Sequence, residues 1–239
     1  MSALTRINVS RILFATVFIA AVFLSPRQPA VAQQTALPTS TPVENEPLHK
    51  VLFQNDSVIV LKLTLPPGQS TQFHTHTHDR VAIELSTAEI TQQKMNEPEG
   101  PKTATKPGNF NALTLAGPSY THRVHNVGKT PYEVLDIELL QRPETPSPAL
   151  AATVAAENSS ARIYNWILAP GITSPMHAHA RPYVIISITE INLAMSSPDG
   201  QSATHGVGPG DFRFVDAKVT HNLGNVGMTP GQIIEVELK

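Results

Sequence analysis

The sequence contains no cysteine, and this absence removes several kinds of chemistry. Without cysteine there is no disulfide, no thiolate metal site and no cysteine nucleophile, so any metal ion must be held by imidazole, carboxylate or carbonyl groups. A basic excess is missing too, because 17 lysines and arginines face 19 aspartates and glutamates, for a formal net charge of −2. Nucleic-acid binders need positive charge to contact phosphates, so we expect no nucleic-acid partner.

Charged residues are also scarce, at 15% of 239 residues, whereas prolines number 21. This composition favours short strands joined by turns over long surface helices. The chain is long enough for one large domain or two small ones. The sequence therefore predicts an all-β protein.

The apolar run Ile12–Leu24 is short of the roughly 20 residues that a helix needs to cross a bilayer. Arg6 and Arg11 precede this run, and Ala30-Val31-Ala32 follows it, which is the layout of a cleaved secretory signal. We expect residues 1–32 to be a signal peptide and the mature chain to be secreted or periplasmic, with no stable membrane anchor. A permanent anchor is the alternative interpretation.

Two segments rich in proline and small residues divide the rest of the chain. Residues 33–47 are predicted to be a flexible, unfolded leader, and residues 142–159 an interdomain linker. The remaining segments, 48–141 and 160–239, resemble one another, so they are predicted to be two copies of one domain.

The repeat is visible residue by residue. In each copy a glycine stands six residues before the first histidine of a His-x-His pair, and about 45 residues later a lone histidine has an asparagine four positions after it. Each copy closes on an alternating segment, 134–139 or 233–238, which is typical of a strand with one buried face. The two sets are Gly68, His74, His76, His122 and Asn126, and Gly171, His177, His179, His221 and Asn225.

The histidine pairs have the spacing of metal ligands. In an extended strand alternate side chains share a face, so both imidazoles of a His-x-His pair point the same way. A third imidazole from a neighbouring strand would complete a facial set of nitrogen donors around one cation, with positions left open for water or substrate. Polar surface or hydrogen-bonded core histidines are the alternative. We expect two metal sites, formed by His74, His76 and His122 and by His177, His179 and His221.

These residues resemble the two motifs of the cupin superfamily, Gly-x5-His-x-His and Gly-x10-His-x3-Asn. The second copy keeps the full spacing of the second motif, from Gly210 to His221, whereas Gly108 lies too far from His122 in the first copy. The resemblance covers nearly all of the chain after the leader. It implies a bicupin, with two tandem antiparallel jelly-roll barrels, and it also implies a homodimer, because cupins often pair through their sheets.

Cupins usually have a glutamate after the histidine pair as a fourth ligand, and neither copy has it. Arg80 or Val81 stands at that position in the first copy, and Tyr183 or Val184 in the second. The apolar Val81, Ile83 and Leu85 are expected to face inward, which would turn Glu84 away. By resemblance, this shifts the expectation from manganese-dependent oxalate decarboxylation to three-histidine dioxygenases or metal-binding cupins without known chemistry.

A second alignment of the copies would pair His76 and His78, instead of His74 and His76, with His177 and His179. His78 is therefore a spare ligand or a proton carrier. The other histidines lie outside the motifs and are predicted to be solvated loop residues; they are His49, His125 and His205.

The leading functional interpretation is an exported metal-binding bicupin, with activity as a metal-dependent oxygenase on a small oxygen-rich substrate as its catalytic form. The cofactor would be a divalent transition metal, either Fe, Zn, Ni, Cu or Mn. The alternative is a non-catalytic module that binds metal or a small molecule, which the lack of a recognisable general acid or base favours. In a third interpretation only one copy is catalytic, and the full motif spacing would make that the second copy.

Overall fold

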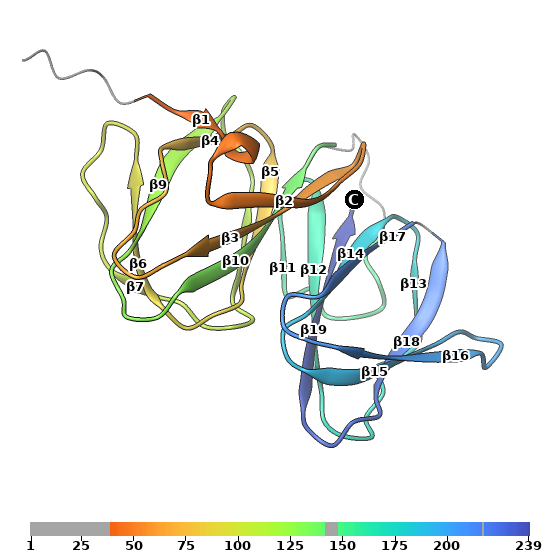
Figure 1. The fold of residues 1–239 in the computed structure, drawn as a ribbon. Coiled ribbons are helices and arrows are strands. Elements are labelled where there is room, and N and C mark those ends of the chain that lie inside the picture. The colour runs from red at the N-terminus through yellow and green to blue at the C-terminus, as the bar shows by residue number, and fades with distance from the viewer. Residues whose placement is uncertain (1–38, 142–147, 217) are drawn as a thin grey trace, which may run out of the picture. The chain divides into compact units, whose positions relative to one another are not determined.

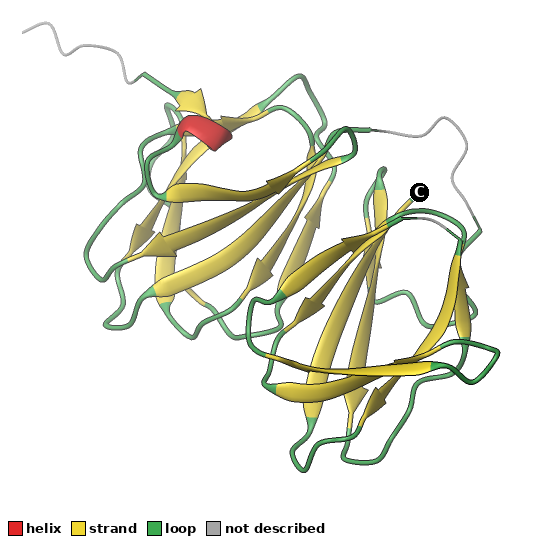
Figure 2. Cartoon of the chain, turned by 45° about the vertical axis from the view of Figure 1, so that its right-hand side comes forward, coloured by secondary structure: helices red, strands yellow, loops and turns green. Residues whose placement is uncertain are grey.

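The structure is a computed structural model that describes residues 39–141, 148–216 and 218–239. The predicted signal peptide, residues 1–32, lies outside the described residues. No helix that the described residues form combines the length and the apolar character needed to span a membrane. Strands dominate the described chain, with a single short 3-10 helix, which confirms the all-β prediction (Figure 2).

The first half forms two sheets, with strand orders β1-β4-β9-β6-β7 and β2-β3-β10-β5-β8 (Figure 1). All pairings are antiparallel except that of β1 with β4, which is parallel. We call this half barrel 1. Its elements are β1 (Thr41–Pro42), η1 (Val43–Asn45), β2 (His49–Gln54), β3 (Val58–Leu65), β4 (His74–His76), β5 (Asp79–Glu84), β6 (Glu89–Lys94), β7 (Thr103–Ala104), β8 (Phe110–Leu113), β9 (Tyr120–Asn126) and β10 (Tyr132–Leu139).

The second half, barrel 2, repeats this plan with sheets ordered β11-β12-β19-β14-β17 and β13-β18-β15-β16. All of its pairings are antiparallel. The two halves confirm the prediction of two tandem β-barrels. The strands of barrel 2 are β11 (Ala156–Glu157), β12 (Ala161–Leu168), β13 (His177–His179), β14 (Tyr183–Ser187), β15 (Ile191–Ser196), β16 (Ser202–Val207), β17 (Phe212–Val215), β18 (Val219–Asn225) and β19 (Gly231–Leu238).

The closing strands β10 and β19 are buried on both faces, not on one face as the alternating pattern suggested. In β10, Leu135, Ile137 and Leu139 belong to one hydrophobic cluster, while the intervening Asp136 and Glu138 are buried on the opposite face. Because side chains alternate along a strand, one face of β10 packs outward and the other faces the inside of the barrel.

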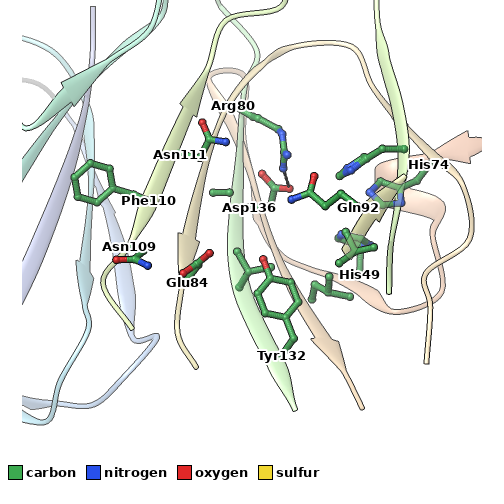
Figure 3. A pocket seen from close by; sticks show the side chains of 15 residues that line it. His49, His74, Arg80, Glu84, Gln92, Asn109, Phe110, Asn111, Tyr132 and Asp136 are labelled. Atoms are coloured by element: carbon green, nitrogen blue, oxygen red, sulfur yellow. Dashed lines mark hydrogen bonds and ion pairs between the residues drawn. The ribbon is translucent and has the colours of Figure 1, made fainter. Parts of the chain in front are cut away.

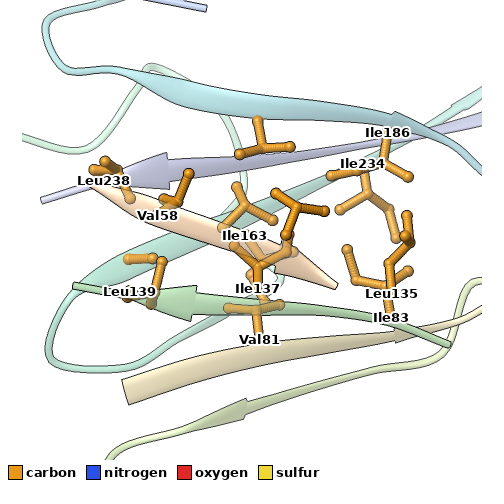
Figure 4. Packing of buried hydrophobic residues seen from close by; sticks show 14 of the residues in the cluster. Val58, Val81, Ile83, Leu135, Ile137, Leu139, Ile163, Ile186, Ile234 and Leu238 are labelled. Carbon is orange, nitrogen blue, oxygen red and sulfur yellow. The ribbon is translucent and has the colours of Figure 1, made fainter. Parts of the chain in front are cut away.

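The outward faces of the two barrels pack against each other (Figure 4). The cluster they form is made of aliphatic side chains from β3, β5 and β10 of barrel 1 and from β12, β14 and β19 of barrel 2, and we call it the seam. Most of these side chains are fully buried, so the two barrels share one apolar core within the chain. Among the members are Val58, Val81, Ile83, Ile137, Ile163, Ile186 and Ile234.

The prediction of a flexible leader over residues 33–47 is wrong for its last residues, 41–47, which are structured. Thr41 pairs with His74, Val43 is 2% exposed, and the Glu46 carboxylate accepts hydrogen bonds from the backbone N–H groups of Leu48, His49 and Gln72. A buried valine and a buried, hydrogen-bonded carboxylate tie this segment to barrel 1.

The end of the predicted linker is structured as well. Ala156 and Glu157 form β11, and the Asn158 side-chain amide donates to the backbone oxygens of Arg80 and Leu113. The Ser160 hydroxyl donates to Asp79 Oδ2 at 2.8 Å. Residues 156–160 therefore contribute polar contacts beside the seam.

Candidate metal centres

A tight turn precedes each histidine pair. Gly68 and Gly171 have φ angles of 74° and 75°, in the left-handed region that favours glycine. Their N–H groups donate to the backbone oxygens of Asn126 and Asn225, both at 2.8 Å. The glycine and the asparagine of the sequence motifs thus fasten the turn to the strand that carries the third histidine.

The asparagine side chains also hold the neighbouring loops in place by hydrogen bonds. Asn126 Nδ2 donates to the oxygens of Leu65 and Thr130, and its Oδ1 accepts from Gly128 N–H. Asn225 makes the same three bonds at the matching positions of barrel 2. The motif asparagine is therefore a buried structural residue that shapes the loop.

Site 1 lies inside barrel 1, where His74 on β4 is directly opposite His122 on β9. His76 shares the face of His74, as the alternation in an extended strand requires. The three side chains are at most 2% exposed, and each offers a nitrogen within 4.8 Å of the others. The structure therefore brings together the three histidines predicted for this site.

Site 2 repeats this arrangement in barrel 2, where His177 on β13 is opposite His221 on β18. His177, His179 and His221 are at most 4% exposed. A fourth residue joins them here: Glu235 on β19, fully buried, has an oxygen within 4.8 Å of all three histidine nitrogens.

The expectation of a site without an acidic member is thus wrong for barrel 2. Glu235 Oε2 lies 3.3 Å from His177 Nε2, and Oε1 lies 3.5 Å from His179 Nε2 and 3.2 Å from His221 Nε2. The cupin motif places its glutamate after the histidine pair, whereas Glu235 comes from the closing strand. The repeat could have indicated this acidic residue, because a carboxylate stands at the matching position of each copy, Asp136 and Glu235.

The Nδ1 atoms of the paired histidines are held in the same way in both sites. His74 and His177 donate to the backbone oxygens of Gln72 and Pro175, at 3.0 and 2.9 Å. His76 Nδ1 lies 2.7 Å from Glu138, and His179 Nδ1 lies 3.1 Å from Glu237. With the proton on Nδ1, Nε2 carries the lone pair that can bind a cation, which is the usual arrangement behind metal-binding histidines. In site 1, His76 Nε2 lies 3.1 Å from His122 Nε2, a contact that a bound cation would replace.

The donor set of site 2 fits a metal ion. His177 Nε2, His179 Nε2, His221 Nε2 and Glu235 Oε1 are buried and have no partner in good hydrogen-bond geometry, and the three nitrogens contact the Glu235 carboxylate only at 3.2 to 3.5 Å. Unpartnered buried polar atoms are costly, and a group of four that converge is satisfied by a single cation. Imidazole nitrogens and one carboxylate are common ligands of divalent transition metals.

Two aromatic side chains enclose site 2. The Trp166 ring stacks on His177 with centroids 5.0 Å apart, and its indole N–H donates to Glu235 Oε2 at 2.7 Å. Tyr183 stacks on His179 with centroids 3.8 Å apart and is fully buried. A cavity of about 300 Å³ in barrel 2 is lined by residues such as Ile185, Met195 and Arg213, and its lining includes none of the four site 2 residues.

The corresponding acidic residue of barrel 1, Asp136, has a different partner. Arg80 Nη1 donates to Asp136 Oδ2, and both side chains are buried. Burial alone would raise the pKa of Asp136, but the Arg80 charge holds this pKa below its ordinary value. Asp136 is therefore ionised and neutralised by Arg80.

Charge and burial separate the two sites electrostatically. Burial, together with the charge of His49 for His74 and of Arg80 for His76, lowers the pKa of each imidazole to about 3. In site 2, burial would lower the pKa of His179, yet Glu235 and Glu237 raise it to about 9. Site 1 is thus a set of neutral imidazoles, while site 2 contains a carboxylate whose pKa the facing histidines hold well below normal, against the effect of burial.

Site 1 opens into a cavity of about 100 Å³ (Figure 3). His74, His122 and Asp136 line one part of it, and amide and guanidinium side chains line much of the rest. The polar lining residues include Arg80, Gln92, Asn109, Asn111 and Tyr132.

Glu84 also lines this cavity, so the expectation that it turns away is wrong. The inner face of β5 carries Arg80, Ala82 and Glu84, whereas the apolar Val81 and Ile83 lie in the seam. The alternation was identified, but its apolar face was assigned to the inside of the barrel instead of the contact between barrels.

His49 is not a solvated loop residue. It lies on β2, is 7% exposed, and its Nδ1 donates to Glu46 Oε2 at 2.7 Å. Its ring lies 4.6 Å from that of His74, centroid to centroid, and lines the cavity. We predicted a solvated residue because His49 lies outside both histidine motifs, and only its tertiary contact with His74 places it in the cavity.

The remaining histidines lie outside both sites. His78 Nδ1 is 3.8 Å from Glu138 Oε2 and the side chain is 37% exposed, so His78 lies at the edge of site 1. His125 on β9 pairs with Glu99, and His205 on β16 is exposed. The prediction of a solvated residue fits His205, whereas His125 is half-buried, and both lie on strands and not in loops.

Comparison with known proteins adds one relative by sequence. No model of a known protein family matches the chain. Over 92 residues the chain is 29% identical to the beta-alanine degradation protein BauB of Pseudomonas aeruginosa, a match that covers 38% of this chain and 96% of BauB. The match thus spans a stretch about as long as one barrel.

Solved structures resemble a larger part of the chain. A cupin 2 conserved barrel domain protein from Leptotrichia buccalis has a TM-score of 0.51 at 10% identity, covering 80% of this chain and 88% of its own. Salicylate 1,2-dioxygenase from Pseudaminobacter salicylatoxidans has a TM-score of 0.53 at 12% identity, and the match covers 76% of this chain and 71% of the dioxygenase. Oxalate decarboxylase from Bacillus subtilis, in a structure that concerns its Mn(II) centres, has a TM-score of 0.50 at 12% identity. The match covers 77% of this chain and 69% of the decarboxylase. At these identities the likeness shows the fold, which is cupin-type.

Proposed function

We propose that the protein binds one divalent transition metal ion in each barrel. The observation behind this proposal is the convergence of buried histidine nitrogens at both centres, with Glu235 as a fourth donor in barrel 2. The Nδ1 contacts of the paired histidines aim their Nε2 atoms at the centre. The ligands would be His74, His76 and His122 in site 1, and His177, His179, His221 and Glu235 in site 2.

The donor atoms limit the range of candidate metals but do not select one metal. Imidazole suits iron, zinc, nickel and copper, and a carboxylate suits manganese as well. Among the similar structures, the oxalate decarboxylase has Mn(II) centres. We retain Fe, Zn, Ni, Cu and Mn as candidates for this chain.

We further propose that barrel 1 is a metal-dependent oxygenase chamber for a small, oxygen-rich substrate. A bound redox-active ion such as iron(II) would supply the chemistry of dioxygen at three nitrogen ligands, with coordination positions left open. The cavity beside His74 and His122 gives a ligand access to this centre. Arg80, Gln92 and Asn111 line the cavity and offer N–H donors to substrate oxygens.

This assignment reverses the earlier choice of barrel 2 as the active copy. That choice relied on motif spacing, whereas four protein donors and the flanking Trp166 and Tyr183 leave less room for a substrate in site 2. For a tetrahedral ion such as zinc, a closed set of four protein ligands is typical of structural sites, and an open set of three is typical of catalytic ones.

A non-catalytic metal-binding module is the second candidate. The enclosed geometry of site 2 favours it, because this centre fits storage or structural binding without turnover. Fold alone does not decide between the two candidates. Export of the mature chain, a small-molecule ligand and a homodimer remain proposals based on the sequence.

Metal analysis of the purified protein tests metal binding directly. We expect two transition-metal ions per chain after reconstitution, and one in each of the variants His74→Ala and His177→Ala. Failure to bind any stoichiometric transition metal would contradict the proposal.

Turnover is tested separately by dioxygen consumption with the iron-loaded protein and a panel of diketones and keto acids. The oxygenase proposal predicts consumption that His74→Ala abolishes and that the cavity variant Asn111→Ala changes. Full metal occupancy without consumption would favour the non-catalytic module.

A further inference from the structure

Asp136 and Glu235 occupy the same place in the two barrels. Asp136 is the cross-strand partner of Ala82, and Glu235 is that of Ile185, in matching pairs of strands. Two residues later, Glu138 and Glu237 each contact the Nδ1 atom of the second histidine. The two strands therefore present equivalent inner faces, each with a carboxylate beside three histidines.

The residues beside these carboxylates differ. Arg80 is the cross-strand partner of Glu138, and Tyr183 is that of Glu237, so they occupy equivalent positions. Arg80 donates to Asp136, whereas Tyr183 stacks on His179 and leaves the Glu235 carboxylate facing the histidines.

This difference changes which carboxylate can share an ion with the histidines. Glu235 lies within 4.8 Å of all three histidine nitrogens of site 2. Asp136 comes this close to His76 and Glu138, but it is not in the group that His74, His76 and His122 form. Aspartate is one methylene shorter than glutamate, and Arg80 holds one of its oxygens.

We propose that Arg80 is a positioning residue that withholds Asp136 from site 1 and thereby makes the two metal sites unequal. Site 2 then binds the ion with three imidazoles and an anionic ligand, while site 1 binds it with neutral nitrogens beside the Arg80–Asp136 pair, which has no net charge. Because an anionic ligand attracts a divalent cation and a neutralised pair does not, site 2 fills first. This inference rests on the proposed metal binding and goes beyond it.

The single tryptophan offers a direct test in the unmodified protein. Trp166 stacks on His177, so a paramagnetic ion in site 2 quenches its fluorescence, whereas site 1 has no tryptophan. During titration of the metal-free chain with Co(II), we expect quenching to be complete at the first of two bound equivalents. Quenching that extends evenly over both equivalents, or that accompanies only the second, would overturn the proposal.

A matched pair of variants tests the carboxylates themselves. Zn(II) affinity is measured by competition with a chelator in His177→Ala for site 1 and in His74→Ala for site 2. Glu235→Gln should weaken site 2 by about tenfold or more, whereas Asp136→Asn combined with Arg80→Met, which removes the ion pair without leaving a lone charge, should leave site 1 within about threefold. An equal loss in both sites would contradict the role of Arg80.

A transplant tests the cause. Arg80→Tyr combined with Asp136→Glu copies the site 2 residues into barrel 1 and should raise the Zn(II) affinity of site 1 by about tenfold. Arg80→Tyr with Asp136→Gln is the control and should show no gain, and circular dichroism checks that both variants fold. An equal gain in the control contradicts the proposal; if the variants do not fold, the Co(II) titration decides. Two sites of equal affinity would overturn this inference alone, whereas the absence of metal binding at either site would overturn the proposed function.

Discussion

Trp166 donates its indole N–H to Glu235 Oε2 at 2.7 Å, while its ring stacks on His177. One side chain thus orients both an acidic and an imidazole member of site 2. The contact explains how a fully buried carboxylate keeps its position on β19. It also defines a substitution that separates the hydrogen bond from the stacking.

Trp166→Phe should keep an aromatic ring on His177 and remove the hydrogen bond to Glu235. A hydrogen bond to a charged group contributes about 1.5–3 kcal/mol, so we expect a loss of this order in the free energy of unfolding of the metal-free protein. Urea denaturation followed by circular dichroism measures it. An unchanged midpoint would show that the indole N–H does not hold the carboxylate.

The metal-free protein should lose stability as the pH falls below 6.5. Folding lowers the pKa of His74 and His76 from 6.5 to about 3, so the unfolded chain binds protons in this range and the folded chain does not. Each of these histidines contributes a slope of up to about 1.4 kcal/mol per pH unit. Urea midpoints between pH 6.5 and 4 check this, and His74→Ala should reduce the slope.

A second loss of stability is expected on the alkaline side. The pKa of His179 is about 9 in the folded chain, so its stabilisation is complete below 6.5 and disappears as the pH rises through 9. Burial and Asp136 raise the pKa of Glu138 from 4.5 to about 8, which adds a loss up to pH 8. Metal loading should abolish the His179 part, because a bound ion needs the neutral imidazole. Urea midpoints of both forms between pH 6.5 and 9 decide this, and parallel curves would contradict it.

Asn126→Ala should destabilise barrel 1 without removing a metal ligand. It eliminates three hydrogen bonds of a buried side chain, each with a net contribution of about 0.5–1.5 kcal/mol, and leaves the oxygens of Leu65 and Thr130 without this donor. We expect a loss of about 2–4 kcal/mol in urea denaturation. Asn111→Ala, at an exposed position, is the control and should cost less than about 0.5 kcal/mol.

Ile137→Ala should reveal whether the barrels unfold together. The side chain is fully buried in the seam, and truncation of such a residue costs about 2–5 kcal/mol. Because both barrels contribute to the seam, we expect one cooperative transition at a lower temperature in calorimetry. Val226→Ala, at a residue 58% exposed, is the control. A variant in which only half of the transition moves would show that the barrels are independent.

The sequence predicts the histidines of both centres well, because two strict local rules determine their placement. Alternation in a strand puts His74 and His76 on one face, and a turn glycine fixes where that strand begins. The duplication then supplies a second, independent instance of the same spacing. The cupin-type fold follows from the same residues.

The acidic residues could not be placed in this way. Both faces of β10 and β19 are buried, so alternation alone does not tell which face lines a barrel and which lies in the seam. Glu84 was assigned to the wrong face for the same reason. Glu46 and His49 were missed because their contacts with Gln72 and His74 are tertiary, and the composition of the segment says nothing about them.

The two-sided closing strands have an evolutionary consequence. Even and odd positions of β10 serve different neighbours: Leu135 and Ile137 meet the other barrel, while Asp136 and Glu138 meet the histidines. Inward residues of one copy can therefore change after duplication, as the difference between Arg80 and Tyr183 illustrates. The aliphatic residues on the other face still pack in the seam. Such a layout allows the inward residues of each half to change independently, while both halves continue to contribute to the seam.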